Sequence, residues 1–361
     1  MRRWIARHHF LAFYLVAIAL PALLFIYLTV IEGLARMGGG AEASVFMRFV
    51  QTRERLHVEW PLLTQHQDGL PKMLFLYFMV PLASPFLFFP FAPTISALIV
   101  TRLNQGTLAV RALVSLLRPV CGPVAQGEAI QTYALLLAAL VVIVVAPWLY
   151  LDLLGEAGAA THFARGLGLN HPASFAMGWG VALFMNQGGL LEELGWRGYA
   201  WPWLVRYFGD PFKAALLLGV AWAMWHSPRD VWMWATGQQT LGMILEWLVI
   251  FVPACVGMTL MAVYFVNRTG GSVLPAIMIH GCLNYLAQGF SSGNTGVRST
   301  VPAEWSVVWV AAGLVTLAIA GRDLAWSRRA AIHGPARATD PARHWCPDDS
   351  GQNGKQEGRH A

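Results

Sequence analysis

The stretch GGLLEELGWRGYAWPWL, from Gly188 to Leu204, places two adjacent glutamates at the end of a long apolar run. Glu193 and Arg197 are four residues apart, which is the separation and polarity that suit an ion pair within one helix. Glu192 is rotated by about 100° from Glu193 around a helix axis. The two carboxylates therefore cannot do the same job, and we expect Arg197 to neutralise one while the other points into a cavity.

The composition is that of a membrane protein. The chain has 361 residues, of which 56% are hydrophobic and 12% are charged, and its mean hydropathy is +0.50. A soluble globular chain is about 25% charged. Abundant Gly, Pro and Trp are also typical of membrane helices and their interfaces. We therefore expect an all-α, polytopic integral membrane protein built as a helical bundle.

Apolar runs long enough to cross about 30 Å of hydrocarbon predict about eight transmembrane helices. They cover residues 10–30, 73–100, 131–151, 172–194, 212–234, 241–266, 272–290 and 301–320. The run at 73–100 contains four prolines and is expected to be interrupted, because each proline breaks the helical hydrogen-bond ladder. Residues 106–118 are too short to span the bilayer and read as an interfacial amphipathic helix.

The distribution of charge predicts the orientation. Basic residues concentrate before the first span, at 102–118 and at 322–329, and these places alternate with hydrophobic runs. The positive-inside rule then puts both termini in the cytoplasm. The net charge of +6 is explained by this pattern, so no nucleic-acid partner is expected. The polar tail at 322–361 is predicted to be a disordered cytoplasmic segment.

Titratable groups are rare inside the expected spans. Of eleven histidines, only His226 and His280 fall there, and Asn284 follows His280 by one helical turn. An ionisable group in hydrocarbon costs roughly 2.5–3.5 kcal/mol on insertion scales. Gathering these groups with Glu192 and Glu193 in one wet, protein-lined cavity would lower that cost, so three helices are expected to converge there. Whether nearby Asn186 and Gln187 line the cavity or join helices stays open.

Three motifs in this order resemble those of the CPBP intramembrane proteases, which include type II CAAX prenyl endopeptidases and bacteriocin-processing or immunity proteins. Glu192-Glu193-x-x-x-Arg197 resembles the EExxxR motif, and His280-x-x-x-Asn284 resembles HxxxN. Trp222-x-x-x-His226 resembles FxxxH with Trp in place of Phe, which keeps an aromatic wall. The similarity extends over roughly 131–290 and implies a CPBP-like protease core at 131–321, preceded by N-terminal membrane helices, a loop and an interfacial amphipathic helix at 1–130.

The resemblance implies an intramembrane endopeptidase. Glu192 and His226 would polarise a water molecule, His280 and Asn284 would donate to the developing oxyanion, and Glu193 and Arg197 would support them. The implied substrates are peptides or protein tails that enter from the membrane or the cytoplasm. The CAAX branch implies lipidated substrates. Membrane lipids surround the protein, and a bacterial inner membrane is the expected setting.

Other interpretations fit the same residues. Two histidines and a carboxylate are the ligands of a catalytic zinc, so Glu192, His226 and His280 could instead hold a metal. A proton-coupled transporter could use the same three groups as a relay, although no inverted repeat is evident. A catalytically silent immunity or scaffold protein of the same fold is a further alternative, although no motif residue is missing.

Overall fold

The computed structural model describes residues 2–39, 44–59, 69–83, 88–155, 157–236, 239–291 and 303–326. These residues are helical almost throughout, and their isolated β-bridge joins Gly69 to Asn186. The first helices are α1 (Arg2–Ile5), α2 (His9–Gly39), α3 (Val45–Glu59), α4 (Leu70–Met79), α5 (Phe88–Gln105), α6 (Thr107–Ser115), α7 (Gln126–Leu154), α8 (Ala159–Gly166) and α9 (Pro172–Met185). The others are α10 (Gln187–Glu193), the π-helix η3 (Leu194–Ala200), α11 (Trp201–Phe208), α12 (Pro211–Met224), α13 (Ser227–Ala235), α14 (Leu241–Arg268), α15 (Leu274–Ser291) and α16 (Ala303–Ala320). The expected all-α class is confirmed.

Four of the described helices are long and apolar enough to cross a membrane, namely α2, α7, α14 and α16. Their composition and length confirm a polytopic integral membrane protein. Three of the remaining expected spans are interrupted, and the fourth, α15, is as long as α16 but less apolar, so the count of eight stays a prediction. The short helix expected at 106–118 corresponds to α6.

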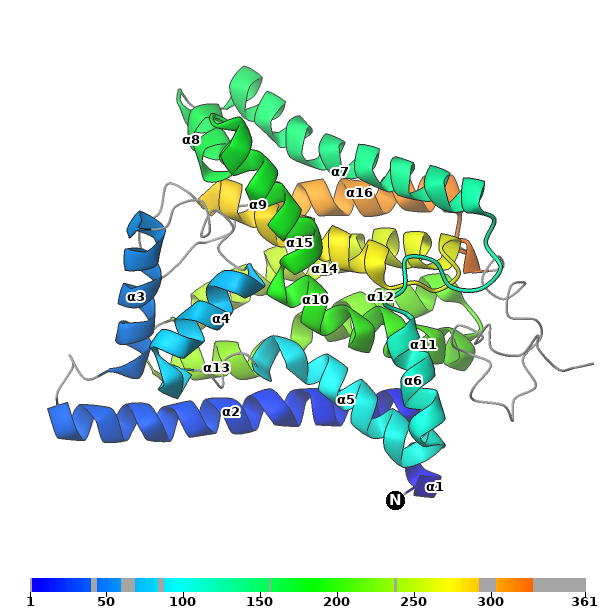
Figure 1. Ribbon diagram of the computed structural model, residues 1–361, viewed down its shortest axis with the longest axis horizontal. Coiled ribbons are helices and arrows are strands. Elements are labelled where there is room, and N and C mark those ends of the chain that lie inside the picture. The colour runs from blue at the N-terminus through cyan, green and yellow to red at the C-terminus, as the bar shows by residue number, and fades with distance from the viewer. Residues whose placement is uncertain are drawn as a thin grey trace, which may run out of the picture.

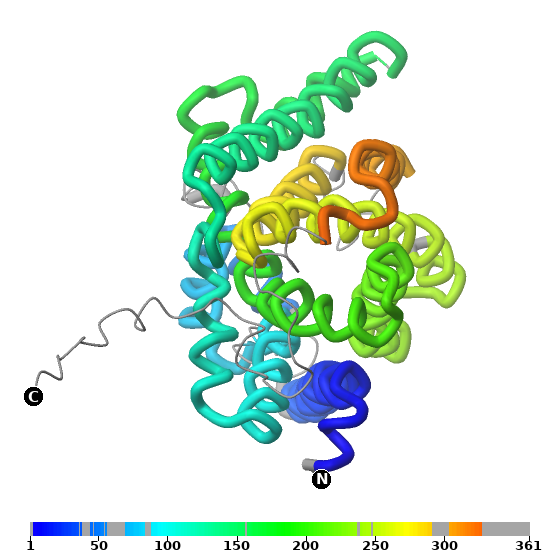
Figure 2. Tube along the Cα trace, turned by 90° about the vertical axis from the view of Figure 1, so that its right-hand side faces the viewer, coloured from blue at the N-terminus to red at the C-terminus, as the bar shows by residue number. Residues whose placement is uncertain are grey.

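The long helices frame the bundle. In Figure 1, α2 runs along one edge and α7 and α16 along the opposite edge, with α10, α12, α14 and α15 between them. Figure 2 looks along α2 and α16, which are seen end-on. Glycines bring α14 and α16 together, because a Cβ atom on Gly257 would overlap the backbone of Trp309 and one on Gly313 would overlap Gly257. Such small residues allow membrane helices to pack backbone against backbone.

The N-terminal helix α2 is hydrogen-bonded to α12 and to the residue that follows it. The hydroxyl of Tyr14 donates to the carbonyl of Ala221 at 3.0 Å. The indole Nε1 of Trp225 donates to the carbonyl of Ala17 at 2.8 Å. Each bond joins residues more than two hundred positions apart. The membrane helices before residue 130 are therefore fastened directly to the helix bundle that carries the motifs.

The span expected at 172–194 is interrupted. Helix α9 ends at Met185, and Asn186 takes an extended backbone conformation (φ −67°, ψ 128°) before α10 begins. The side-chain oxygen of Asn186 accepts the backbone N–H of Gly189 at 2.8 Å, so it caps the new helix. Asn favours such local bonds over the interior of a helix, and the two glycines that follow have low helix propensity. The chain then continues through η3 and α11, so the interval between the spans expected at 172–194 and 212–234 is helical to Phe208.

The span expected at 212–234 is also interrupted. Helix α12 ends at Met224, and α13 begins at Ser227 with Pro228 in its first turn. Proline has no N–H to donate to a continuing helix but fits the start of a new one. His226 consequently lies at a junction between two helices and not in the middle of a span.

Other expected segments differ in detail. The run at 73–100 divides into α4 and α5, as its prolines suggested, with 84–87 outside the described residues. The interval between the spans expected at 131–151 and 172–194 contains α8. The disorder predicted for the tail falls almost wholly on 327–361, which lie outside the described residues.

Candidate active site

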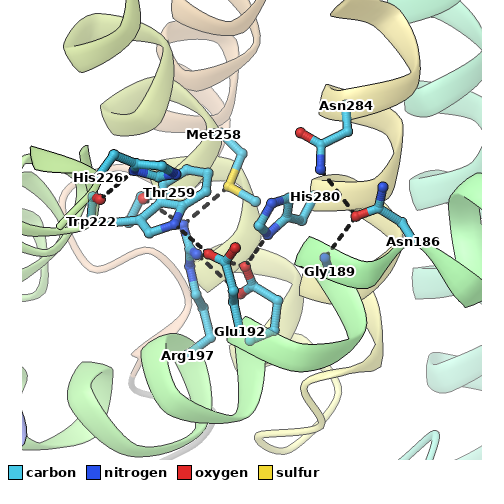
Figure 3. A network of polar contacts seen from close by, with 11 residues as sticks. Asn186, Gly189, Glu192, Arg197, Trp222, His226, Met258, Thr259, His280 and Asn284 are labelled. Atoms are coloured by element: carbon cyan, nitrogen blue, oxygen red, sulfur yellow. Dashed lines mark hydrogen bonds and ion pairs between the residues drawn. The ribbon is translucent and has the colours of Figure 1, made fainter. Parts of the chain in front are cut away.

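The motif residues meet where α10, η3, α12 and α15 converge (Figure 3). Helix α10 carries both glutamates, η3 carries Arg197, α12 carries Trp222, and α15 carries His280 and Asn284. Glu192 is 4% exposed, and Glu193 and Arg197 are fully buried. The structure thus brings together side chains from distant parts of the sequence, as the cost of isolated polar groups in hydrocarbon suggested.

Glu193 is the centre of this network. Its two carboxylate oxygens accept hydrogen bonds from Nη1 of Arg197 at 2.8 and 3.0 Å, which is the expected ion pair one helical turn apart. Its Oε1 also lies 2.7 Å from Nδ1 of His280. Arg197 reaches further, and its Nη2 donates to Oγ1 of Thr259 at 2.6 Å. Each charged group of this buried pair therefore has several partners, which a buried ion pair needs to offset its desolvation.

The contact with Glu193 fixes the proton on His280. An ionised carboxylate only accepts hydrogen bonds, so Nδ1 of His280 carries the proton in this contact. Nε2 of the same ring then accepts a proton in the neutral form and donates only in the doubly protonated form. A carboxylate that holds one ring nitrogen fixes the orientation of the imidazole as well.

Glu192 has a different partner. Its Oε2 accepts the indole N–H of Trp222 at 2.8 Å. The guanidinium carbon of Arg197 lies 4.7 Å from the centre of the Trp222 ring, and the ring of His280 meets this indole edge-on with centroids 5.0 Å apart. The motif predicted an aromatic wall at Trp222 and did not indicate this hydrogen-bond donor. The replacement of Phe by Trp in the motif was the signal that could have revealed it.

His226 presents one ring nitrogen to the backbone. Its Nδ1 lies 3.1 Å from the carbonyl oxygen of Trp222 and 3.3 Å from that of Ala223. Carbonyl oxygens only accept, so Nδ1 carries the proton and Nε2 is the basic atom of the neutral ring. Phe251 meets the His226 ring edge-on, with centroids 4.9 Å apart. Backbone carbonyls and an aromatic ring thus fix the orientation of this imidazole.

Asn186 links the helix break to the second half of the HxxxN motif. Its Oδ1, which caps α10, also accepts a hydrogen bond from Nδ2 of Asn284 at 3.0 Å (Figure 3). A Cβ atom placed on neighbouring Gly188 would lie 2.8 Å from Nε2 of His280 and 3.1 Å from Nδ2 of Asn284. The two nitrogen atoms thus face a space beside Gly188 that any larger residue would fill. Asn186 both joins the helices and contacts the site, which answers the question that the sequence left open.

A zinc site of Glu192, His226 and His280 was one alternative that the sequence left open. In the part of the chain that the structure describes, no three His, Cys, Asp or Glu side chains are grouped so that they could hold a metal ion. One ring nitrogen of His280, Nδ1, is directed at Glu193, a contact that neutral hydrogen-bonding histidines and metal-ligating histidines share.

Comparisons with known proteins agree with the motifs. The sequence model of the family described as type II CAAX prenyl endopeptidase Rce1-like matches residues 173–286, a range that contains all the residues of the network. CAAX prenyl protease 2 of Methanococcus maripaludis is 32% identical over 97 residues, which are 26% of this chain and 34% of that protein. The chain thus aligns with about a third of this relative's length. No solved structure matches the chain. Residues 173–286 of this chain are thus similar to the Rce1-like family, and they carry the three motifs.

Proposed function

We propose that this protein is an intramembrane endopeptidase that hydrolyses peptide bonds in membrane-associated peptides or protein tails. The observation that carries the proposal is the buried network of Glu192, Glu193, Arg197 and His280 within the Rce1-like segment. Burying so many titratable groups is costly, and in a membrane such groups mark functional sites. CAAX proteases are endopeptidases by family description, and the geometry suits the chemistry.

Glu192 and His226 are the proposed pair that activates water. The Oε2 atom of Glu192 is held by Trp222, which leaves Oε1 to accept a proton from the attacking water. His226, with Nδ1 turned to backbone carbonyls, offers Nε2 as a second acceptor. General bases positioned in this way contribute typically about 10²–10⁴-fold to a rate.

His280 and Asn284 are the proposed donors to the oxyanion. One N–H of the Asn284 amide is directed at Asn186, and the amide carries a second N–H. His280, whose Nδ1 is turned to Glu193, donates from Nε2 when its ring carries both protons. Donors fixed before the reaction are among the largest contributions to catalysis.

The proposed substrates are lipidated peptides. The relative from Methanococcus is named a prenyl protease, and this chain's site lies among membrane helices that a lipid-modified tail can reach through the bilayer. A farnesylated peptide that ends in a CAAX sequence is the probe of choice. An unmodified peptide of the same sequence separates recognition of the lipid from recognition of the chain.

The proposed setting is a bacterial inner membrane with both termini in the cytoplasm. Its support is the positive-inside pattern, in which Arg2, Arg3 and Arg7 precede the first long apolar helix. Reporter fusions at the two ends, read on both sides of the membrane, test this orientation.

The deciding experiment is a cleavage assay on the full-length protein in lipid nanodiscs, with products identified by mass spectrometry. We expect cleavage by the native protein and a loss of at least about 10²-fold in Glu192→Gln and His226→Ala. His171→Ala, a change at an exposed histidine outside the network, is the matched control and should retain full activity. Cleavage at the native rate in Glu192→Gln would contradict the proposed base.

A chelator arm addresses the metal alternative. We expect 1,10-phenanthroline to leave the rate unchanged, because the three candidate ligands are not grouped for a metal. Inhibition that added zinc reverses would instead favour the metalloprotease. Absence of cleavage of either peptide, with proton uptake driven by a gradient, would favour the transporter.

A further inference from the structure

We infer that Trp222 is a positioning residue for Glu192, an inference that rests on the proposed function. Its indole N–H fixes the Glu192 carboxylate in the orientation needed to activate water. The motif to which Trp222 corresponds has Phe at this position in the family pattern, and Phe cannot donate a hydrogen bond. The difference of one N–H group is therefore a property of this chain.

The hydrogen bond from Trp222 to Glu192 joins two buried side chains. Nε1 of Trp222 lies 2.8 Å from Oε2 of Glu192, and the indole is 1% exposed. Trp has a single donor and no acceptor, and a buried indole N–H without a partner is unfavourable. The carboxylate of Glu192 is thus the group on which this donor depends, and a hydrogen bond to an ionised acceptor is stronger than one between neutral groups.

The indole ring of Trp222 is also held in position by its neighbours. Its face packs against the guanidinium of Arg197, 4.7 Å from the ring centre, and Arg197 in turn holds Glu193. The indole therefore contacts Glu192 directly and Glu193 through one intermediate. Rotation of the Trp222 ring is restricted on its face by Arg197 and at its edge by the ring of His280.

The bond from Trp222 has a consequence for the proposed reaction. A carboxylate without a fixed partner rotates about its last side-chain bond, and its two oxygens exchange places. With Oε2 held, only Oε1 remains for the water. The donor also favours the ionised form of Glu192, which is the form that accepts a proton. Trp222 thereby acts on the reaction through Glu192 without touching the substrate.

The test compares Trp222→Phe with Trp196→Phe. Trp196 is fully buried in η3, and its Nε1 has no hydrogen-bond partner. The two changes remove the same atoms from two buried indoles, but only the first removes a hydrogen bond. In the cleavage assay we expect Trp222→Phe to lower kcat about tenfold with little change in KM. We also expect the acidic limb of its pH–rate profile to move to higher pH, whereas Trp196→Phe leaves the profile in place.

A second readout does not depend on activity. In protein labelled with ¹⁵N-tryptophan, the indole resonance that disappears in Trp222→Phe is that of Trp222, and Glu192→Gln should displace it. An unmoved resonance would show that the bond is absent and would overturn the inference. A native enzyme that cleaves its peptide, with an unaltered pH profile in Trp222→Phe, would overturn it while leaving the proposed function intact. Failure of the native protein to cleave would instead count against the proposed function, and with it the role of Trp222 in catalysis.

Discussion

Glu193 and His280, which lie 87 positions apart in the sequence, share a contact of 2.7 Å between Oε1 and Nδ1. The same oxygen lies 2.8 Å from Nη1 of Arg197. One buried carboxylate thus contacts two nitrogen donors from two helices, α15 and η3. The contact ties the stability of the bundle to the orientation of a proposed oxyanion donor.

Removing the charge of Glu193 should therefore destabilise the protein. In Glu193→Gln the guanidinium of Arg197 remains buried without its counter-charge, and breaking a buried ion pair typically costs about 3–5 kcal/mol. We expect a lower unfolding midpoint in a denaturant titration of the protein in micelles. The double variant Glu193→Leu/Arg197→Met replaces both charges with apolar groups and should recover much of that stability without recovering cleavage. Equal midpoints for Glu193→Gln and the native protein would contradict this account of the pair.

Gly188 should be required for catalysis more than for folding. The Cβ atom of Gly188→Ala would lie 2.8 Å from Nε2 of His280 and 3.1 Å from Nδ2 of Asn284, the two side chains that we propose as oxyanion donors. We expect kcat to fall by about 10²-fold, the effect of losing one such donor, with a smaller change in KM. Gly180→Ala in α9 is the matched control, because a Cβ atom there meets nothing within 4 Å. A similar kcat in both alanine variants would show that the space beside Gly188 is not used.

Asn186 combines two tasks that substitutions can separate. Its Oδ1 caps α10 and accepts a hydrogen bond from Asn284. Asn186→Ala removes the cap of α10, so we expect the free energy of unfolding to fall by about 1 kcal/mol. We also expect most of the activity to be lost. Asn186→Ser keeps a good capping group on a shorter side chain, so we expect it to regain stability but not kcat. The measurements are the unfolding midpoint and the cleavage rate, and recovery of both by Ser would contradict the link to Asn284.

A pH effect on stability is expected at the start of α12. The Asp210 carboxylate accepts the backbone N–H of Lys213 and pairs with Arg322, and these contacts hold its pKa below the ordinary value. A lowered pKa in the folded state gives a stabilisation that is present above the ordinary value of about 3.9 and is lost as the pH falls through the folded value. The unfolding temperature of Asp210→Ala should therefore lie below that of the native protein at pH 7 and approach it at lower pH.

The control for this experiment is Asp210→Asn, which remains a good helix cap but does not titrate. The difference in unfolding temperature between Asp210→Asn and Asp210→Ala should be independent of pH. A gap between the native protein and Asp210→Ala that widens in acid would contradict the assignment.

The fold class and the residues that meet could be predicted because both follow from the cost of polar groups in hydrocarbon. Apolar runs of known length indicate membrane helices, and the pairing of Glu193 with Arg197 follows from the helical repeat. His280 could be grouped with the glutamates because isolated titratable groups are so unfavourable in lipid. None of these predictions depends on the orientation of one helix relative to another.

The other features of the site depend on contacts between helices, which no local sequence pattern encodes. The contact of His280 with Glu193 depends on the rotation of α15 against α10, and the bond from Trp222 to Glu192 depends on the position of α12. The break at Asn186 divides a run whose hydropathy alone suggests a continuous span. Its cause is a competition between a side-chain cap and the helical ladder, which hydropathy does not measure.

Two hydrogen bonds that join α2 to the α12 region, Tyr14 to Ala221 and Trp225 to Ala17, have a consequence for biosynthesis. Helix α2 leaves the ribosome long before α12, so the carbonyl of Ala17 is already in the bilayer when its donor arrives. A protein shortened to 131–361 would insert Trp225 with no such acceptor, and an unsatisfied polar group in the bilayer core costs several kcal/mol. The helix that lies outside the family-matched region is thus a template on which that region assembles, and supplying residues 1–130 as a separate chain should rescue the shortened protein.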